Sequence, residues 1–450
     1  MRPPRASELD TIVALATPMA RSAIAVARLS GTEAFAIVRR IAPGLPEMPA
    51  PRTAMLAELR DAKGKTFDRG LVTFFPAPAS YTGENVAEIS IHGNPVLARL
   101  LLASAEAAGA RLAEPGEFSR RAFLNEKLSL IEAESVAELI EAPTETAARG
   151  ALARLSGGGE RAIEPVREAL LTAHALWTAA IDFPEQAGEE DPAEIGRHLA
   201  AARGRLARLC RGAELAARIA SGFRVAILGA PNAGKSTVFN RLVGYERAIV
   251  TPEAGTTRDT LEADVEIAGL PVRLVDTAGI RETESAIEAE GVLRATAEGR
   301  EADLAIWLHD ASVPWNDAAR RGWGSLDSHI KALVFNKIDI APPPFEPGSI
   351  GLSAISEDAA TRLREEIGRR LSAEFPPEAA GESVSRRQRD LLSRARDAVA
   401  RSEAALARRD PAEIAILGVE DALASLAELV GESTTEDVLD RIFAKFCIGK

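Results

Sequence analysis

The sequence has little of what disulfide-stapled, zinc-binding or membrane-spanning proteins need. Among its 450 residues there are only two cysteines, Cys210 and Cys447, which are too few for a disulfide framework. The five histidines are scattered and form no recognisable ligand cluster, which argues against a zinc site. No uninterrupted apolar run approaches membrane-spanning length, and residues 1–10 lack the apolar core of a secretory signal. We therefore expect a cytoplasmic protein with no membrane partner.

The net charge also bears on possible partners. A formal charge of −12 argues against a general electrostatic grip on nucleic acid, although it leaves room for a local one. Arginines do concentrate in two stretches, 197–224 and 386–401. Each stretch is either a solvated helix face whose arginines pair with carboxylates or a surface that binds RNA or a partner. The solvated face is the more common outcome for such runs.

What the sequence does contain is a phosphate-binding motif, Gly229-Ala-Pro-Asn-Ala-Gly-Lys-Ser236. It follows the mostly apolar run 223–228 and precedes a helix-like segment that begins at Thr237, which is the strand–GxxxxGK[ST]–helix pattern of a P-loop. Backbone N–H groups and the helix N-terminus can surround the phosphates. Lys235 can reach the β- and γ-phosphates, and the Ser236 hydroxyl can bind Mg²⁺. The alternative is a tight glycine-rich turn without a ligand.

Two later motifs identify the base. Asn336-Lys-Ile-Asp339 follows the buried-type strand 332–335. Asp339 can accept two hydrogen bonds from guanine, whereas adenine would leave a buried carboxylate unpaired, and sites of that kind reject the wrong base strongly. Ser353-Ala354 follows the expected strand 350–352 and is typical of the loop that backs the base. Together with the P-loop, these motifs predict GTP as the nucleotide.

A further motif, Asp276-Thr-Ala-Gly279, ends the mostly apolar run 272–275. Its carboxylate suits a water-bridged contact to Mg²⁺, and the bare backbone of Gly279 can approach a γ-phosphate. Many small GTPases follow this motif with a glutamine that orients the attacking water. This chain has Ile280, so another group must do that work. The sequence alone does not choose among the downstream candidates Arg281, Glu282, Glu284, Glu288 and Glu290.

The loop at 249–259, with the sequence IVTPEAGTTRD, suggests a second cation. Thr256 or Thr257 can place a hydroxyl on Mg²⁺. Backbone carbonyls around Thr251–Gly255 and the amide oxygen of Asn232 form a neutral, oxygen-rich site, which suits a monovalent cation better than Mg²⁺. Such a cation could neutralise charge in the transition state, as an arginine finger does elsewhere. The alternative is that Asn232 only shapes the loop.

Composition divides the chain into four stretches. Residues 1–118 are rich in short strands and turns, which indicates an α+β domain. Residues 119–219 are helical, with a capping box at Ser129-Leu-Ile-Glu132. Residues 220–377 alternate strands with helices, as a doubly wound parallel sheet requires, and residues 378–450 are helical again. The predicted architecture is an α/β P-loop GTPase domain inserted into a discontinuous all-α bundle, preceded by the α+β domain.

The whole chain, not only its GTPase segment, resembles the MnmE (TrmE) family of tRNA-modification GTPases. The resemblance spans all of the predicted domains in order, and a terminal Cys-x-Gly-Lys beside an inserted GTPase is highly specific. The segments that carry it are Asp10–Pro18, Arg28–Gly31, Tyr81–Glu84, Pro115–Phe118, Arg121–Asn125 with Lys127-Leu128, the GTTRD loop at 255–259, and Cys447-Ile-Gly-Lys450.

The resemblance implies a specific activity. The N-terminal domain would bind folate and dimerise, and GTP hydrolysis would be K⁺-dependent and activated when G domains pair. An FAD-containing partner would join the homodimer in a heterotetramer. Together they would add an aminomethyl or carboxymethylaminomethyl group at C5 of the wobble uridine of certain tRNAs. The one-carbon unit would come from 5-formyl- or methylene-tetrahydrofolate.

The resemblance also assigns roles to positions of this sequence. It makes Lys235, Cys447 and Glu288 the catalytic candidates, with Glu288 orienting the attacking water. The implied folate ligands are Arg28, Glu88, Lys127 and Lys450, although a surface ion pair remains the alternative for the first three. The implied Mg²⁺ ligands are Ser236 and Thr257, and the implied K⁺ ligands are Asn232, Thr251, Glu253 and Thr256. The GTP-binding residues are Asn232, Ala233, Gly234, Lys235, Ser236, Thr237, Thr251, Gly255, Thr256, Thr257, Asp276, Thr277, Ala278, Gly279, Asn336, Lys337, Asp339, Ser353 and Ala354.

Three departures from the family pattern concern the folate site: Met19-Ala-Arg-Ser22 in place of a glycine-rich stretch, Asn94 in place of a second glycine, and Glu126 beside Lys127. Three other functions stay open at this point. A ribosome-assembly or translation-linked GTPase would explain residues 220–375 alone. A GTP-switched scaffold would use the arginine-rich helices, and a folate enzyme acting alone would use the G domain for regulation.

Overall fold

The computed structural model describes residues 10–47, 50–182, 192–244, 261–276, 301–326, 328–375 and 386–449. The chain forms two compact units. Unit 1 comprises residues 1–137, 154–202 and 394–450, and unit 2 comprises 138–153 and 203–393. The predicted four-part division at residues 118, 219 and 377 stays a prediction, because the borders between the two compact units fall at other positions, within or at the ends of helices.

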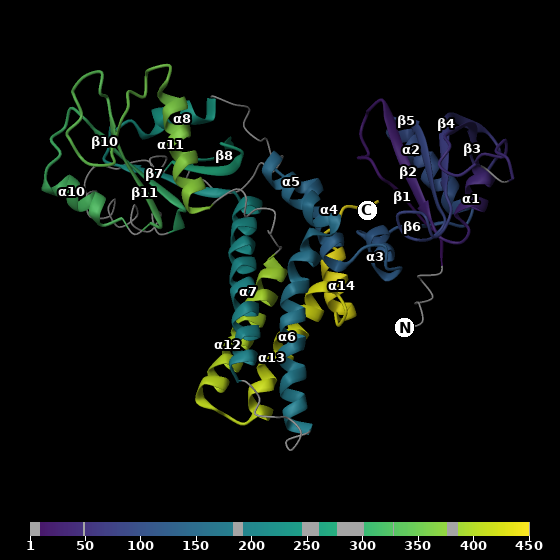
Figure 1. Cartoon of the computed structure of the whole chain (residues 1–450). Helices are drawn as coiled ribbons and strands as arrows, with labels where there is room; N and C mark the ends of the chain where they lie inside the picture. Colours follow the sequence, from purple (N-terminus) through teal and green to yellow (C-terminus); the bar gives the residue numbers. More distant parts are fainter. Residues whose placement is uncertain are drawn as a thin grey trace. The chain divides into compact units, whose positions relative to one another are not determined.

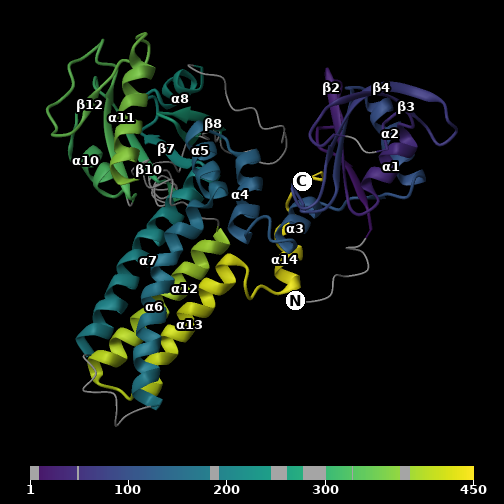
Figure 2. The same cartoon turned by 45° about the vertical axis from the view of Figure 1, so that its right-hand side comes forward.

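The first part of unit 1 is a six-stranded sheet covered on one face by two helices (Figures 1 and 2). Buried Leu29, Phe74, Ile89 and Leu101 belong to the core between the sheet and these helices. All strand pairs are antiparallel except β1 with β6. In spatial order the strands are β3 (Met55–Arg60), β4 (Thr66–Phe75), β5 (Val86–His92), β2 (Ile24–Ser30), β1 (Ile12–Leu15) and β6 (Arg111–Leu112), with helices α1 (Ala34–Ile41) and α2 (Pro95–Ala107).

The rest of unit 1 is helical. The predicted capping box is confirmed: the Ser129 N–H donates to Glu132 Oε2 at 3.0 Å, and the Glu132 N–H donates to Ser129 Oγ at 3.2 Å. The helices break at Gly157, which has a positive φ inside a π-helical segment. The elements are α3 (Glu117–Leu124), α4 (Leu130–Glu141), the π-helix η2 (Arg154–Gly158), α6 (Gly159–Asp182), α13 (Ala412–Val430) and α14 (Glu436–Phe443), with parts of α7 (Pro192–Ser221) and α12 (Arg386–Arg408).

Unit 2 holds a second six-stranded sheet with helices on both faces (Figure 1). Val238 and Leu363 bring α8 and α11 onto one face, and Trp307 and Trp323 belong to the apolar cluster on the other. In spatial order the strands are β12 (Ile350–Gly351), β11 (Ile330–Asn336), β10 (Leu304–Asp310), β7 (Phe223–Gly229), β9 (Leu270–Asp276) and β8 (Leu261–Ile267). The unit's helices include α5 (Glu145–Ala153), α8 (Lys235–Gly244), α10 (Asp317–Gly324) and α11 (Ala359–Glu374).

This sheet departs from a purely parallel one at its edge. The neighbours from β12 to β9 run parallel, but β8 pairs antiparallel with β9. The two strands are joined by Ala268-Gly269, and both residues have positive φ, which is the backbone of a tight two-residue hairpin. Because such a turn returns the chain directly, no crossover helix separates these strands.

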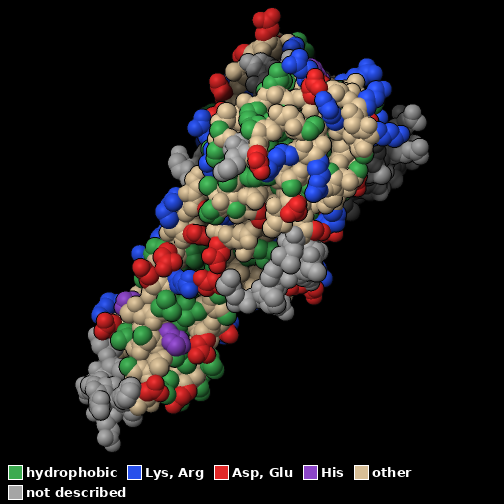
Figure 3. All heavy atoms as spheres, turned by 90° about the vertical axis from the view of Figure 1, so that its right-hand side faces the viewer, with side chains coloured by type: hydrophobic (Ala, Val, Ile, Leu, Met, Phe, Trp, Pro, Cys, Tyr) green, Lys and Arg blue, Asp and Glu red, His purple; other side chains and the backbone are tan. Residues whose placement is uncertain are grey.

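The second arginine-rich stretch is extensively ion-paired. Arg389 and Arg396 pair with the next residue, Asp390 and Asp397, and two further arginines reach α13. These are Arg394 with Glu428 and Arg401 with Asp421. On the face drawn in Figure 3, basic and acidic side chains are interspersed. The pairing agrees with a solvated helix face for these four arginines.

Among the described residues, no helix combines the length and the apolar character that crossing a membrane requires.

Candidate functional site

The P-loop lies between β7 and α8, where the backbone takes conformations that most residues avoid. Asn232 and Gly234 both have positive φ, at 62° and 97°. A β-carbon on Gly234 would overlap the side-chain amide of Asn336, so this close approach requires glycine. The loop therefore turns tightly at the C-terminal end of a parallel strand, which is the usual position of phosphate sites in such folds.

Lys235 is the first residue of α8. Its ammonium donates hydrogen bonds to the loop's own carbonyls at Gly229 and Ala230, each at 2.9 Å. The next two side chains, Ser236 and Thr237, are exposed. The loop thus combines a cation, a helix N-terminus and accessible hydroxyls, and this donor set fits a nucleotide phosphate with Mg²⁺.

Asp276 ends β9 on the strand next to the P-loop strand. It lies opposite Ile227 in the parallel register and is fully buried. A buried carboxylate at the end of the strand beside the P-loop is suited to a metal-linked role. The chain reaches Asp276 through a buried apolar strand, as the sequence predicted.

Asn336 ties together two of the sequence motifs. It is buried at the end of β11, where its amide nitrogen donates to the Ala233 carbonyl at 2.8 Å. Its amide oxygen accepts the Ala354 N–H at 2.9 Å. One side chain therefore joins the P-loop to the Ser353-Ala354 loop, and both backbone partners are buried. The amide of Asn336 therefore fixes the P-loop and the 353–354 loop (the base loop) relative to each other.

The two residues after Asn336 that the sequence assigned to the nucleotide differ in environment. Asp339 is exposed, not buried as expected for base selectivity, and so is accessible to a base edge. Lys337 has a positive φ of 64°, and its ammonium lies 2.6 Å from Asp310 Oδ2. Burial would raise the pKa of Asp310, but hydrogen bonds from Lys337 and Ser312 outweigh it and lower this pKa to about 2. Sequence reasoning missed Asp310, because its partner Lys337 directly follows a different strand, β11.

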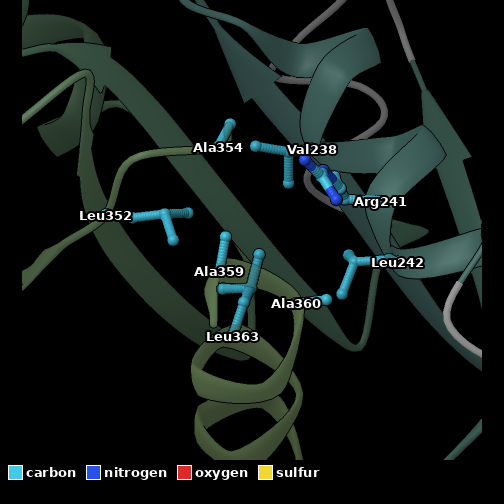
Figure 4. Close-up of a pocket in the computed structure, with 8 residues that line it drawn as sticks. All are labelled: Val238, Arg241, Leu242, Leu352, Ala354, Ala359, Ala360 and Leu363. Atoms are coloured by element: carbon cyan, nitrogen blue, oxygen red, sulfur yellow. The ribbon is translucent and has the colours of Figure 1, made fainter. Parts of the chain in front are cut away.

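A small apolar pocket lies behind the base loop (Figure 4). Arg241 is its one charged lining residue, and its guanidinium donates to the Ile355 carbonyl at 3.0 Å. The pocket is a packing feature between α8, the 352–354 loop and α11, without the polar groups that a nucleotide needs. Its lining residues are Val238, Arg241, Leu242, Leu352, Ala354, Ala359, Ala360 and Leu363.

In unit 1, Arg28 of β2 and Glu88 of β5 lie opposite each other in the sheet register. Two guanidinium nitrogens of Arg28, Nε and Nη2, donate to Glu88 Oε1 at 3.0 and 2.8 Å. The third, Nη1, is buried and has no hydrogen-bond partner among the described residues. The guanidinium also faces the rings of Tyr81 and Phe118, at 5.2 and 5.9 Å. This group is prepared to donate to one more acceptor beside two aromatic faces.

Lys127, another predicted folate ligand, is exposed after α3. A β-carbon on Gly83 would lie 3.2 Å from its Cγ, so the lysine stem lies against the β4–β5 loop. That same loop carries Tyr81, whose hydroxyl hydrogen-bonds Ser119 at 2.8 Å. Burial raises the pKa of Tyr81. Lys127 and Arg28 thus both contact the loop around Tyr81.

The C-terminal tail docks on the N-terminal part of unit 1. Ile448 forms an antiparallel bridge with Pro115, and the Gly116 N–H donates to the Cys447 carbonyl at 3.4 Å. A β-carbon on Gly449 would overlap the Leu15 carbonyl, so the tail lies directly against the end of β1. Cys447 itself is exposed. A thiol that composition alone would leave at a loose terminus is therefore held on a defined surface.

The loop that receives this tail is fixed by an ionic network. Glu117 accepts the Glu114 N–H and is bonded by Arg111 and by Arg121. Burial would raise the pKa of Glu117, but these hydrogen bonds lower it. Arg111 and Arg121 also donate to Asp10, just before β1. The network links both ends of the tail's docking surface, at β1 and at α3.

Comparisons with known proteins give matches along nearly the whole chain. Residues 11–127 match the family model described as GTP-binding protein TrmE N-terminus, and residues 130–447 match that of the MnmE helical domain. A curated relative from Aquifex aeolicus (strain VF5), tRNA modification GTPase MnmE, is 40% identical over 98% of this chain and 100% of its own length. Relatives of the same name from Azoarcus sp. (strain BH72) and Myxococcus xanthus (strain DK1622) are 41% and 42% identical and cover 100% and 98% of this chain and 99% of each relative.

The chain belongs to the MnmE family. Because the two family models together cover residues 11–127 and 130–447, and one relative matches the whole chain, the match is not confined to the GTPase segment, as a ribosome-linked GTPase would require. The chain is accordingly a GTPase of the tRNA-modification class.

Several positions that the MnmE resemblance singled out lie outside the described residues. They include the attacking-water candidate Glu288 and the terminal Lys450. The others are Thr251, Glu253, Gly255, Thr256, Thr257, Thr277, Ala278 and Gly279. Their assigned roles stay predictions.

One of the three departures from the MnmE pattern has a local structural explanation. Asn94 caps α2, because its side chain accepts the Val96 N–H at 2.8 Å ahead of Pro95. Glu126 takes a positive φ of 57° where α3 ends. For Met19–Ser22, the Ser22 N–H donates to the Gly93 carbonyl at 3.0 Å, which ties this segment to the turn before α2.

Proposed function

We propose that this chain hydrolyses GTP and, with an FAD-containing partner, modifies C5 of the wobble uridine of certain tRNAs. The group added is of the aminomethyl or carboxymethylaminomethyl type, and its one-carbon unit comes from a tetrahydrofolate. The observation that carries the proposal is the docking of the Cys447 tail on the N-terminal part of unit 1. A GTPase that acted only as a switch would have no need for a thiol held there. Cytoplasmic location accompanies this proposal.

The nucleotide site supports the first half of the proposal. Lys235 and the N-terminus of α8 would hold the phosphates, and Ser236 with Thr257 would hold Mg²⁺. Asp339 would read guanine, and Lys337 would support the base. The K⁺ ligands are proposed as Asn232, Thr251, Glu253 and Thr256, and Glu288 would orient the attacking water.

The Arg28 region supports the second half. The buried Nη1 of Arg28 has no hydrogen-bond partner among the described residues, which fits an acceptor on a folate-type ligand. Tyr81 and Phe118 offer aromatic faces for a flat ring. Lys127 and Lys450 would supply cationic groups for the glutamate tail. The folate would deliver a one-carbon unit, and Cys447 would lie on the docked tail as the nucleophile candidate.

Homodimerisation is also proposed. Leu56 of β3 and Leu71 of β4 lie directly opposite each other and are 60% and 45% exposed. These two adjoining leucines place exposed apolar surface on this side of the sheet, which supports a face that another chain covers. The FAD-containing partner would join this homodimer in a heterotetramer.

The first test is GTP turnover by the purified chain in KCl and in NaCl, with G-domain association followed in the same samples. We expect turnover at least about tenfold faster in KCl, because a cation held by neutral oxygens neutralises transition-state charge. Glu288→Ala serves as the matched variant: it binds GTP normally and stays slow in both salts. Equal wild-type rates in the two salts would remove K⁺ from the proposal, and near-normal turnover by Glu288→Ala would remove that residue.

A further inference from the structure

The end of β10 carries a carboxylate that no sequence motif of the nucleotide site includes. Asp310 lies opposite Asn336 in the parallel register of β10 and β11. Its side chain is 14% exposed. The Ala311 N–H donates to the Asn336 carbonyl at 2.8 Å, so the chain after Asp310 is fixed to the start of the guanine motif.

Both oxygens of Asp310 are in use, and they face different partners. Oδ1 accepts the N–H and the hydroxyl of Ser312, at 2.9 and 2.7 Å, which closes the turn after β10. Oδ2 accepts the Lys337 ammonium at 2.6 Å. A second hydrogen bond, from His309 Nε2 to the Val313 carbonyl at 3.0 Å, holds the same turn without involving Asp310. Only a carboxylate offers an acceptor on both sides at once.

Lys337 needs such a partner more than most residues do. It follows Asn336 directly, in a left-handed backbone conformation, and its side chain is one-third exposed. A free lysine side chain samples many rotamers and loses that freedom when it is ordered. A lysine that an ion pair already holds loses less when a ligand binds, and this preorganisation appears as affinity.

We propose that Asp310 is a positioning residue for guanine-nucleotide binding and acts through Lys337. The inference rests on the proposed function, since it takes Asn336–Asp339 as the base-binding motif. Asp310 fixes the lysine before the nucleotide arrives and leaves the hydrolytic step to other groups. Removing it should therefore change the dissociation constant for the nucleotide and leave turnover at saturating GTP unchanged.

The test is the affinity of the full chain for GDP, measured by titration calorimetry for the wild type, Asp310→Asn, Lys337→Met and the double variant. Asparagine keeps the shape of aspartate but presents only one acceptor, so either the turn or the lysine loses its bond. We expect Asp310→Asn to raise the dissociation constant about tenfold, the scale for a lost bond to a charged group. In the Lys337→Met background the same change should alter it less than about twofold.

The matched control is Asp264→Asn. Asp264 also pairs with a cation across neighbouring strands, Arg273 at 2.9 Å, but on the β8–β9 hairpin. Its loss should leave GDP affinity unchanged. Equal GDP affinity in wild type and Asp310→Asn would overturn the role of Asp310 and leave the proposed function standing. An equal loss in both Lys337 backgrounds would also overturn it. Failure of the wild type to bind GDP would overturn the proposed function and this inference together.

Discussion

Replacing Asn336 with alanine is expected to reduce guanine-nucleotide affinity by about 100-fold or more and to destabilise unit 2 by about 2–5 kcal/mol. The substitution leaves the Ala233 carbonyl and the Ala354 N–H, both buried, without their partner. A buried polar group left unsatisfied costs about 1–3 kcal/mol, and the lost side-chain volume adds to this. Because this side chain joins the P-loop to the base loop, its loss leaves the two halves of the nucleotide site without a fixed position relative to each other.

Two variants sharpen the test of Asn336. Asn336→Asp retains the acceptor for the Ala354 N–H but sets a carboxylate against the Ala233 carbonyl, so it should bind GDP as poorly as the alanine variant. Asn240→Ala removes an exposed asparagine from α8 and should behave as wild type. GDP titration and urea unfolding measure both quantities. An Asn336→Ala protein with wild-type affinity would show that the two loops are held in another way.

Replacing Gly449 with alanine is expected to reduce tRNA modification at least about tenfold while GTP turnover stays at the wild-type level. Gly449 has a φ of 96°, and a β-carbon there would overlap the Leu15 carbonyl. A left-handed conformation costs a non-glycine residue about 1–2 kcal/mol, and a clash between two backbones cannot be relieved by a side-chain rotation. The C-terminal tail therefore detaches from the end of β1, and Cys447 is no longer held beside Pro115 and Gly116. Mass spectrometry of the wobble nucleoside gives the modification level.

The matched control for Gly449 is Gly64→Ala. Gly64 lies in the same unit with a φ of 77°, but no atom of the described residues lies within 4 Å of the position that its β-carbon would take. It carries the same backbone strain without the clash, and modification should persist. If Gly449→Ala modifies tRNA as well as wild type does, tail docking is irrelevant to the reaction. If Gly64→Ala loses as much activity, the effect is one of general stability.

The sequence allowed the local features to be predicted, because their causes lie within a few residues. The P-loop follows from a buried strand, small residues and a helix start, and the capping box at Ser129 follows from a four-residue pattern. The guanine motif was found because Asn336–Asp339 follows a buried apolar strand. Fold class followed from the order of such segments.

What the sequence did not reveal depends on contacts between distant residues. Asp310 acts on Lys337 only because β10 and β11 pair in a particular register. The tail residue Ile448 pairs with Pro115, which lies more than 300 positions earlier in the chain, and no periodic pattern in the sequence predicts that contact. The antiparallel β8 was missed for another reason, since the Ala268-Gly269 turn was not recognised as a hairpin signal. Ala268 is an uncommon residue for a left-handed position.

Transfer of a labelled carbon would show whether a folate supplies the group that is added to the wobble uridine. The chain is combined with its FAD-containing partner, unmodified tRNA, GTP with Mg²⁺, KCl, an amine donor (ammonium or glycine) and tetrahydrofolate carrying a ¹³C one-carbon unit. The wobble nucleoside is then analysed by mass spectrometry. We predict ¹³C on the C5 substituent of the wobble uridine, dependent on GTP. A modified nucleoside without ¹³C, or no modification by a chain that binds and hydrolyses GTP beside an active partner, would contradict the account.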